Sequence, residues 1–419
     1  MKIDKPINSN YAAVVVAIKN IIPLDGCDNV VGTTIFGFQA IVGKDTKVGD
    51  IGVMFPAECQ LSDELCYYNN LYRHGDKTID ESKKGYIEDN RRVKAVKFRG
   101  HPSSCLFMSL DCLNYTRANI SELVEGDEFD TLNGKEVCRK YVVKEREPRE
   151  NKISDRNKFK RVDSKHFPEH FDSDNYFKWS PTVDPEKEVI VTQKIHGTSI
   201  RIGNSIVKRK LTLADRIAKM FGANIKDTEY DYIYGSRKVV KDINNPNQNH
   251  FYDVDLWTIE GKKLDGILPQ NYILFAELIG YTPSGAIIQK GYDYGIEQGK
   301  AELYVYRITI VNDQGIMTDL SWDNIKEFCN NNGLNHVAEL WRGKLRDFKV
   351  EDFMDKRYFD EGYRNCIGLG NNKDIVDEGV CIRVDGLRPY IMKAKAPKFL
   401  EHETKLLDTG EEDLESSQS

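Results

Sequence analysis

A lysine at the end of a β-rich run is the residue whose surroundings in the sequence most favour covalent chemistry. Residues 189–192 alternate in a strand-like pattern and lead to Lys194, and Gly197 in the sequence KIHG predicts a tight turn before a second strand over residues 199–202. An amine is nucleophilic only after losing its proton, which nearby cations and partial burial both favour. The pattern therefore indicates a nucleophilic lysine at the edge of a sheet. At this stage an ordinary surface lysine in a hairpin remains the alternative.

Four more charged residues lie in or beside apolar strands, where a charge without a partner is costly. Glu277 lies in ILFAELIG, Glu378 in DEGVCIRV, and Lys393 and Lys395 share one strand face in YIMKAKAP. Two like charges on one face repel unless an anion lies between them. We therefore expect two carboxylates and three lysines to converge on an anionic ligand, although a structural salt bridge would explain either glutamate by itself.

Composition places the chain among large globular proteins. Its 419 residues are 40% hydrophobic and 30% charged, which fits two or three domains, and no apolar run is long enough to span a membrane. The start lacks the apolar core of a secretory signal. The net charge of −6 includes the acidic end EEDLESSQS, so it does not exclude nucleic-acid binding. Nine cysteines without metal-site spacing indicate reduced thiols in an intracellular protein. The cytoplasm and the nucleus are both open as compartments, and the gene could be cellular or viral.

Short strands and turns over residues 1–143 predict a small β-barrel. We expect strands at residues 12–18, 33–42, 51–55, 93–98, 106–110 and 136–143, and some helix in the polar connection 59–89. The stretch RRVKAVKFRG, residues 91–100, carries five cations and Phe98. It could face a phosphate backbone, or it could be a solvated edge strand.

A second domain follows a charged linker. Residues 144–166 are rich in both signs of charge and poor in large apolar residues, so we place the linker there. Residues 167–405 alternate strands with helices, the helices being expected at 211–221 and 323–331 and the strands near 272–278, 303–310, 379–384 and 390–394. The fold class is therefore α+β with antiparallel sheets and flanking helices. Residues 406–419 are expected to form a disordered acidic tail.

The order of these motifs resembles that of the covalent nucleotidyltransferases, the superfamily of ATP-dependent RNA and DNA ligases and RNA capping enzymes. KIHG looks like the nucleophile motif, with the histidine typical of RNA ligases. The other matching segments are SRK (236–238), FAELIG (275–280), IIQKGYDYG (287–295), LYVYRI (303–308), EGVCIR (378–383) and MKAK (392–395). The preceding β-barrel resembles the amino-terminal OB-fold of RNA ligases that seal 3′-OH ends.

The resemblance implies an ATP-dependent RNA ligase that joins RNA 3′-OH and 5′-phosphate ends, at nicks in duplexes, through lysyl-AMP and RNA-adenylate. It implies ATP and Mg²⁺ or Mn²⁺ as cofactors. RNA or an RNA-containing nicked duplex would be the partner, bound by a monomer away from any membrane. The rival hypotheses are an ATP-dependent DNA ligase, an inactive OB-based nucleic-acid-binding protein and a GTP-dependent capping enzyme.

The basic residues of these motifs take roles from the resemblance. Lys194 would attack the α-phosphorus of ATP, and Lys393 and Lys395 would hold the phosphate. Arg237 would contact ribose or phosphate. His196 would serve the later steps on RNA.

Acidic and neutral residues complete the implied site. Glu277 would receive the ribose hydroxyls, and Glu378 would hold the metal or orient the lysine. Tyr306, or Tyr304 on the same face, would stack on adenine. The remaining two residues are Gly197 in the turn and Gln193, which occupies the position where many relatives place a glutamate beside the adenine.

The chain departs from the family pattern at two further places. Arg307 follows the aromatic motif where an aspartate is common, and residues 238–270 form an insert without a functional interpretation.

Overall fold

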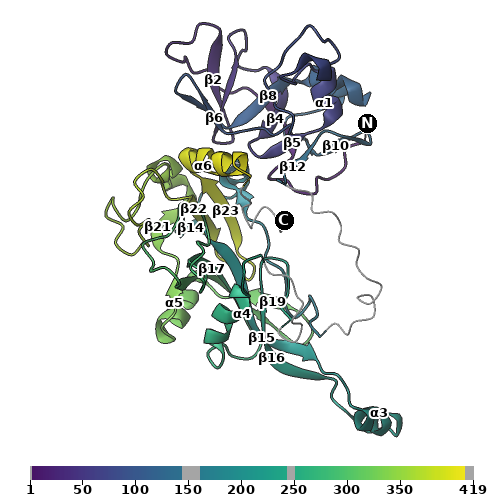
Figure 1. Ribbon diagram of the computed structural model, residues 1–419, viewed down its shortest axis with the longest axis vertical. Coiled ribbons are helices and arrows are strands. Elements are labelled where there is room, and N and C mark those ends of the chain that lie inside the picture. The colour runs from purple at the N-terminus through teal and green to yellow at the C-terminus, as the bar shows by residue number, and fades with distance from the viewer. Residues whose placement is uncertain (1, 144–160, 243–250, 411–419) are drawn as a thin grey trace. The chain divides into compact units, whose positions relative to one another are not determined.

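The protein is described by a computed structural model that covers residues 2–143, 161–242 and 251–410 (Figure 1). The predicted linker (144–166) falls largely on residues 144–160 and the predicted tail (406–419) largely on residues 411–419, and these parts lie outside the described residues. The tail prediction is wrong for residues 406–408, which form the end of a helix. The described residues divide into two compact units. Unit 1 comprises residues 2–143, 174–180 and 395–410, and unit 2 comprises residues 161–173 and 181–394 with the gap noted above.

Unit 1 is built on a four-stranded antiparallel sheet in the order β8-β4-β1-β9. Its strands are β1 (Ala13–Ala17), β2 (Val30–Ile35), β3 (Phe38–Gly43), β4 (Ile51–Pro56), β5 (Cys59–Leu61), β6 (Val96–Phe98), β7 (His101–Ser103), β8 (Cys105–Ser109), β9 (Glu128–Phe129), β10 (Thr131–Leu132), β11 (Lys135–Glu136), β12 (Cys138–Lys140) and β13 (Asp174–Asn175). Its helices are α1 (Asp63–Tyr68), α2 (Tyr176–Trp179) and α6 (Pro397–Asp408).

The central strand β1 is buried on both faces. Val15 packs with Phe55 and Leu65 in one apolar cluster, and Val14 packs with Met54 in another. An apolar run without alternation fits such a strand, because successive side chains point to opposite faces and both faces are covered.

The structure corrects one expected strand of unit 1. Residues 33–42 form part of a hairpin in which β2 and β3 are joined at Phe36 and Gly37, whose φ angles are 48° and 75°. Two consecutive residues at positive φ give the tight turn whose twist suits antiparallel strands. The apolar run hid the turn, since only one of its two residues is glycine.

Cations of the stretch 91–100 form salt bridges with carboxylates of unit 1. Arg92 is fully buried, donates to Glu58 at 3.3 Å and also pairs with Asp408 of α6. Lys94 pairs with the same Asp408 at 2.8 Å. The prediction of a phosphate-facing or solvated strand is therefore wrong for Arg92, because its guanidinium is used to hold the carboxy-terminal helix.

Unit 2 contains two antiparallel sheets with helices beside them. Its strands are β14 (Glu188–Lys194), β15 (Thr198–Lys208), β16 (Thr228–Gly235), β17 (Tyr272–Gly280), β18 (Ala301–Val311), β19 (Met317–Asp319), β20 (Asn335–His336), β21 (Glu339–Lys344), β22 (Gly379–Val384) and β23 (Tyr390–Lys395), and its helices are α3 (Leu213–Met220), α4 (Leu256–Gly261) and α5 (Trp322–Asn331). One sheet has the order β16-β15-β17-β18-β19, and the other contains β23-β22-β14-β21. The predicted α+β class is confirmed.

The connection between the two sheets of unit 2 is only three residues long. Strand β14 ends at Lys194 and strand β15 begins at Thr198. The KIHG turn therefore passes directly from one sheet to the other. Beyond the sheet, β15 and β16 continue as a hairpin that carries α3 at its far end (Figure 1).

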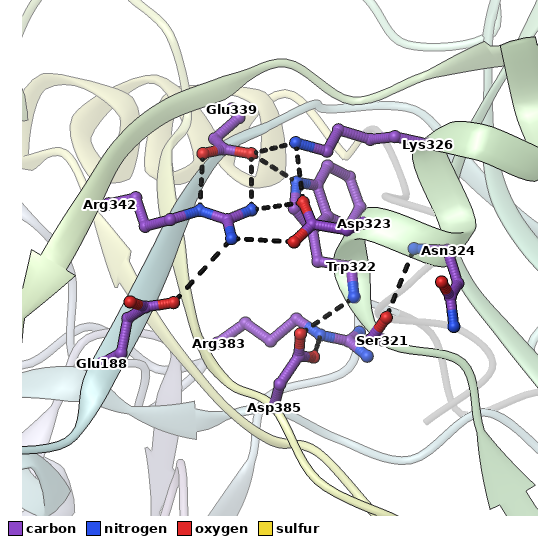
Figure 2. A network of polar contacts seen from close by, with 10 residues as sticks. All are labelled: Glu188, Ser321, Trp322, Asp323, Asn324, Lys326, Glu339, Arg342, Arg383 and Asp385. Carbon is purple, nitrogen blue, oxygen red and sulfur yellow. Dashed lines mark hydrogen bonds and ion pairs between the residues drawn. The ribbon is translucent and has the colours of Figure 1, made fainter.

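A polar network attaches helix α5 to strand β21 (Figure 2). Arg342 donates to both oxygens of Asp323, at 2.7 and 2.9 Å, and its Nε donates to Glu339 at 2.9 Å. The indole N–H of Trp322 and the ammonium of Lys326 also donate to Glu339. The Arg342 guanidinium lowers the pKa of Asp323 to about 2, so this cluster stays ionised at neutral pH.

Among the described residues, no helix is long and apolar enough to cross a membrane.

The docking of α6 on unit 1 generates a stability prediction. The hydroxyl of Thr404 donates to Glu58 at 2.6 Å and accepts from the backbone N–H of Ala95 at 3.1 Å. Thr404→Val keeps the shape but leaves two buried polar groups unpaired, at a cost of about 1–3 kcal/mol. We expect hydrogen exchange at Ala95 and in α6 to become roughly 5- to 100-fold faster. Lys405→Gln, at an exposed position of the same helix, is the control, and unchanged protection in Thr404→Val would contradict the assigned contact.

Candidate active site

Lys194 is the last residue of β14, and its ammonium meets a buried carboxylate. Its Nζ lies 2.7 Å from Oε1 of Glu378, and the two side chains are 16% and 2% exposed. Removing both charges from water is costly, and the attraction between them must offset that cost. The sequence placed these two residues 184 positions apart on separate strands, and the structure brings them into direct contact.

A glycine gives Glu378 its direction. Gly379, the first residue of β22, has a φ of 139°, a backbone angle that residues with a Cβ rarely adopt. Lys194 pairs with Gly379 in the strand ladder, so the preceding residue would face away from Lys194 if the backbone were regular. The glycine conformation instead allows the Glu378 carboxylate to reach the amine.

The KIHG turn packs against strand β17 so closely that only glycine fits at its end. A Cβ on Gly197 would lie 2.3 Å from the carbonyl oxygen of Leu278 and 2.9 Å from Cγ of Glu277. The Gly197 N–H donates to Glu277 at 3.2 Å, and its carbonyl accepts from Gln289 at 2.7 Å. Close approach and two hydrogen bonds thus fix the turn that follows Lys194.

Glu277 accepts protein hydrogen bonds on both of its oxygens. Ser199 of β15 donates to the second oxygen at 3.4 Å. The Ser199 carbonyl accepts in turn from the indole of Trp257 on α4, at 3.0 Å. Trp257 belongs to the insert of residues 238–270, which had no interpretation from sequence, and the structure shows that part of this insert supports the strand beside Glu277.

His196 is held in the turn by two tyrosines of the segment IIQKGYDYG. The Tyr294 hydroxyl accepts from the His196 N–H at 2.7 Å and donates to its carbonyl at 3.2 Å. The Tyr292 ring packs edge-on against the imidazole, with 5.0 Å between the centroids. Nδ1 of His196 lies 3.8 Å from the Glu378 carboxylate. Sequence reasoning recognised this segment only by resemblance and did not foresee these contacts.

Several of the predicted charged residues lie close enough to Cys381 to act on its thiol. Burial raises the pKa of its thiol to about 11, and the charges of Lys194, Glu378, Lys393 and Glu277 act on it as well. Four of the five charged residues expected to converge therefore lie near a single side chain.

The other two predicted cations have contacts of their own. The ammonium of Lys395 pairs with Glu403 of α6 at 2.7 Å. Arg237 pairs with Asp172, and its side chain is largely buried. Carboxylates thus orient both cations.

The aromatic strand β18 contains a bulge at Tyr306. Tyr304 lies opposite Glu277, whereas Phe275 lies opposite Arg307, so Tyr306 is the extra residue between them. Tyr306 packs against the ring of His170, which also contacts Phe275. Both tyrosines therefore lie on the face of the sheet that carries Glu277.

The unusual Arg307 has a neighbouring partner. It forms a salt bridge with Asp319 of β19, and its guanidinium stacks on Phe171 and Phe275 at 4.2 and 4.7 Å. Where many relatives have an aspartate, this chain has an arginine and supplies an aspartate from the adjacent strand. Sequence reasoning noticed the arginine but could not identify its partner.

Gln193 does not face the lysine side of the sheet. Successive residues of β14 point to opposite faces, so Gln193 points away from Lys194. Its Nε2 donates to Ile367 at 3.1 Å and to Asp377 at 2.7 Å, which uses both amide hydrogens. The expected adenine contact of this side chain is therefore corrected: the amide binds the loop behind the sheet.

Beside the aromatic strand lies a cavity of about 710 Å³, whose lining includes Tyr304, His336 and Trp341. Its size is within the range of small-molecule pockets.

The donor set can be compared with what a magnesium or manganese ion requires. No group of three or more acidic, histidine or cysteine side chains forms a metal cage in the part of the chain that the structure describes. A nucleotide-bound Mg²⁺ needs only one or two carboxylates, because phosphates and water fill its other positions. The buried carboxylate of Glu378 fits such an ion.

The tight turn yields a prediction for Gly197→Ala. The added methyl group has to displace the Leu278 backbone, and such overpacking costs about 1–3 kcal/mol of the free energy of unfolding. Chemical denaturation of the full chain measures the loss. Gly43→Ala is the matched control, because a Cβ there has no neighbour within 4 Å. Equal stability of the two variants would show that the turn is not this tight.

Comparison with known proteins identifies a family for the strands that carry these residues. The family model for RNA ligase matches residues 187–395, from the residue before β14 to the end of β23. None of the curated protein sequences searched is significantly similar to the chain.

Several solved structures share the fold over almost the whole chain. Naegleria gruberi RNA ligase with pyrophosphate is 18% identical, with a TM-score of 0.59 and with 94% of this chain and 98% of that chain covered. A lysine variant of the same ligase with ATP and manganese is 16% identical, with a TM-score of 0.57 and the same coverage. Another variant, with AMP and manganese, is 16% identical with a TM-score of 0.58, and covers 93% of this chain and 98% of that chain. Through residues 187–395, the chain belongs to the RNA ligase family of the covalent nucleotidyltransferases.

Proposed function

We propose that the protein is an ATP-dependent RNA ligase that joins RNA 3′-OH and 5′-phosphate ends at nicks in duplexes. The observation that carries the proposal is the contact between the Lys194 amine and the buried Glu378 carboxylate, 2.7 Å apart, within the family's ordered motifs. The similar ligase structures with ATP, AMP and pyrophosphate, two of them with manganese, support ATP and a divalent metal as cofactors.

In the first step Nζ of Lys194 attacks the α-phosphorus of ATP. The N–P bond forms as the bond from the α-phosphorus to the bridging oxygen breaks, and pyrophosphate leaves with that electron pair. The ammonium must first lose a proton, and the Glu378 carboxylate is the acceptor within hydrogen-bond distance. In the alternative role, Glu378 would hold a metal ion, which would neutralise the charge on the leaving pyrophosphate.

The remaining residues bind and orient the nucleotide. Glu277, fixed by Gly197 and Ser199, can accept from the ribose hydroxyls with its remaining lone pairs. Tyr306 or Tyr304 stacks on the adenine. Lys393, Lys395 and Arg237 contact the phosphates or the ribose.

AMP then passes from Lys194 to an RNA 5′-phosphate, and the 3′-hydroxyl of the neighbouring strand displaces it. His196 serves these later steps from the turn, where it lies beside Glu378. We propose that residues 1–143 form an OB-fold that binds the nucleic acid. The four-stranded antiparallel sheet with added hairpins supports a barrel-like module.

Adenylylation is tested with ATP labelled at the α-phosphate. We expect the wild-type chain to become labelled in the presence of Mg²⁺ or Mn²⁺ and to stay unlabelled when the metal is chelated before ATP is added. Lys194→Ala removes the nucleophile and should retain less than about 1% of the label. Lys187→Ala, an exposed lysine just before the same strand, is the control and should label normally. Label on Lys194→Ala would contradict the assignment, and labelling by GTP alone would indicate a capping enzyme.

Substrate choice is tested with nicked duplexes in which the sugar on each side of the break is varied. A ligase for RNA 3′-OH ends should seal nicks with ribose at the 3′-OH terminus at least about tenfold faster than nicks with deoxyribose there. Sealing of all-DNA nicks alone would instead identify a DNA ligase. Binding of the duplex without adenylate would identify an inactive nucleic-acid-binding protein.

A further inference from the structure

The residue before Lys194 and the residue before Glu378 also contact each other. Gln193 comes directly before Lys194, and Asp377 directly before Glu378. Lys194 meets Glu378 at 2.7 Å on one face of the sheet, and Gln193 meets Asp377 at 2.7 Å on the other. The same two chain segments are thus joined twice, once on each face.

The rear contact is buried and uses almost all of its hydrogen-bonding groups. Gln193 and Asp377 are 2% and 3% exposed. The Gln193 amide exchanges two bonds with Ile367, its Nε2 donating to the carbonyl and its Oε1 accepting from the N–H at 3.2 Å. The second oxygen of Asp377 accepts from the Tyr358 N–H at 2.8 Å. Hydrogen bonds at one place therefore join strand β14, the segment that leads into β22, and the intervening loop at Tyr358 and Ile367.

Such a contact controls the geometry on the other face because the chain segments are shared. A buried donor that loses its acceptor remains unsatisfied, which is unfavourable, unless it moves to another partner, and that movement displaces the residue next in sequence. A misplacement of about 1 Å between reacting groups can cost about 100-fold in rate. We propose that Gln193 and Asp377 are a positioning pair that holds the Lys194 amine and the Glu378 carboxylate together for adenylylation.

This inference rests on the proposed function, and it assigns Gln193 a role different from binding adenine. Neither residue contacts the reacting atoms, so the pair acts through its neighbours. The donor and acceptor pattern specifies which changes disrupt it. In Asp377→Asn, one amide N–H faces another, and in Gln193→Glu two carboxylates meet and the Ile367 carbonyl loses its donor.

The double variant Gln193→Glu with Asp377→Asn restores most of the pattern. The asparagine amide then donates to the glutamate, while the asparagine oxygen still accepts from Tyr358 and the glutamate still accepts from the Ile367 N–H. Only the bond to the Ile367 carbonyl remains lost. Compensation between two harmful changes would show that the contact between the two side chains matters, and rates measured on folded protein separate positioning from stability.

The experiment measures the single-turnover rate of lysyl-AMP formation and the KM for ATP in the full chain. Each single variant should lower the rate about 10- to 100-fold with the KM changed less than about threefold, and the double variant should recover to within about fivefold of wild type. Asp374→Asn, an exposed carboxylate in the same loop, is the control and should match wild type. Each variant is assayed at a temperature at which circular dichroism shows it folded. Gln193→Met, which keeps the length and removes the amide, replaces a variant that does not fold.

The outcomes separate this inference from the proposed function. Wild-type rates in both single variants, or a double variant no faster than the slower single one, would overturn the positioning pair while leaving the ligase proposal standing. A wild-type chain that forms no lysyl-AMP would overturn both. A changed KM with an unchanged rate would return Gln193 to nucleotide binding and reject the positioning role.

Discussion

The buried ion pair between Lys194 and Glu378 is the interaction on which the rest of the site depends. Taking an ammonium and a carboxylate out of water is unfavourable, so the pair can persist only where the backbone presents both groups in good geometry. Three features supply that geometry: the end of β14, the tight turn at Gly197 and the positive φ of Gly379. None of these is itself a reacting group, yet each limits which residue types the chain can use.

Neighbouring polar groups near the pair also have partners, which keeps the site ordered before any ligand arrives. Glu277 accepts from the turn and from β15, and His196 is enclosed by two tyrosines. Arg307 shows how the fold tolerates a departure from the family pattern, because Asp319 supplies the opposite charge from the next strand. Electrostatic preorganisation of this kind is commonly the largest contribution to catalysis, since no reorganisation is needed at the moment of reaction.

Sequence reasoning reached the α+β class and most strands of unit 2 because their apolar patterns are long. It also found the charges that meet near Cys381, since a charge within an apolar strand requires a partner. The face of Gln193 could have been read from strand alternation, but resemblance to relatives directed attention to adenine instead. Alternation alone would have shown that Gln193 and Lys194 cannot share a face.

Other features depend on contacts that no local pattern reveals. The partner of Arg307 lies twelve residues away on another strand, and the partner of Arg92 lies on α6, more than 300 residues later.

The proposed reaction requires that the amine of Lys194 takes AMP from ATP. It is tested most directly by incubating the wild-type chain with ATP and Mg²⁺ and mapping its peptides by mass spectrometry. The account predicts one adenylate, located on Lys194, and an adenylate on any other residue, or on none, would contradict it.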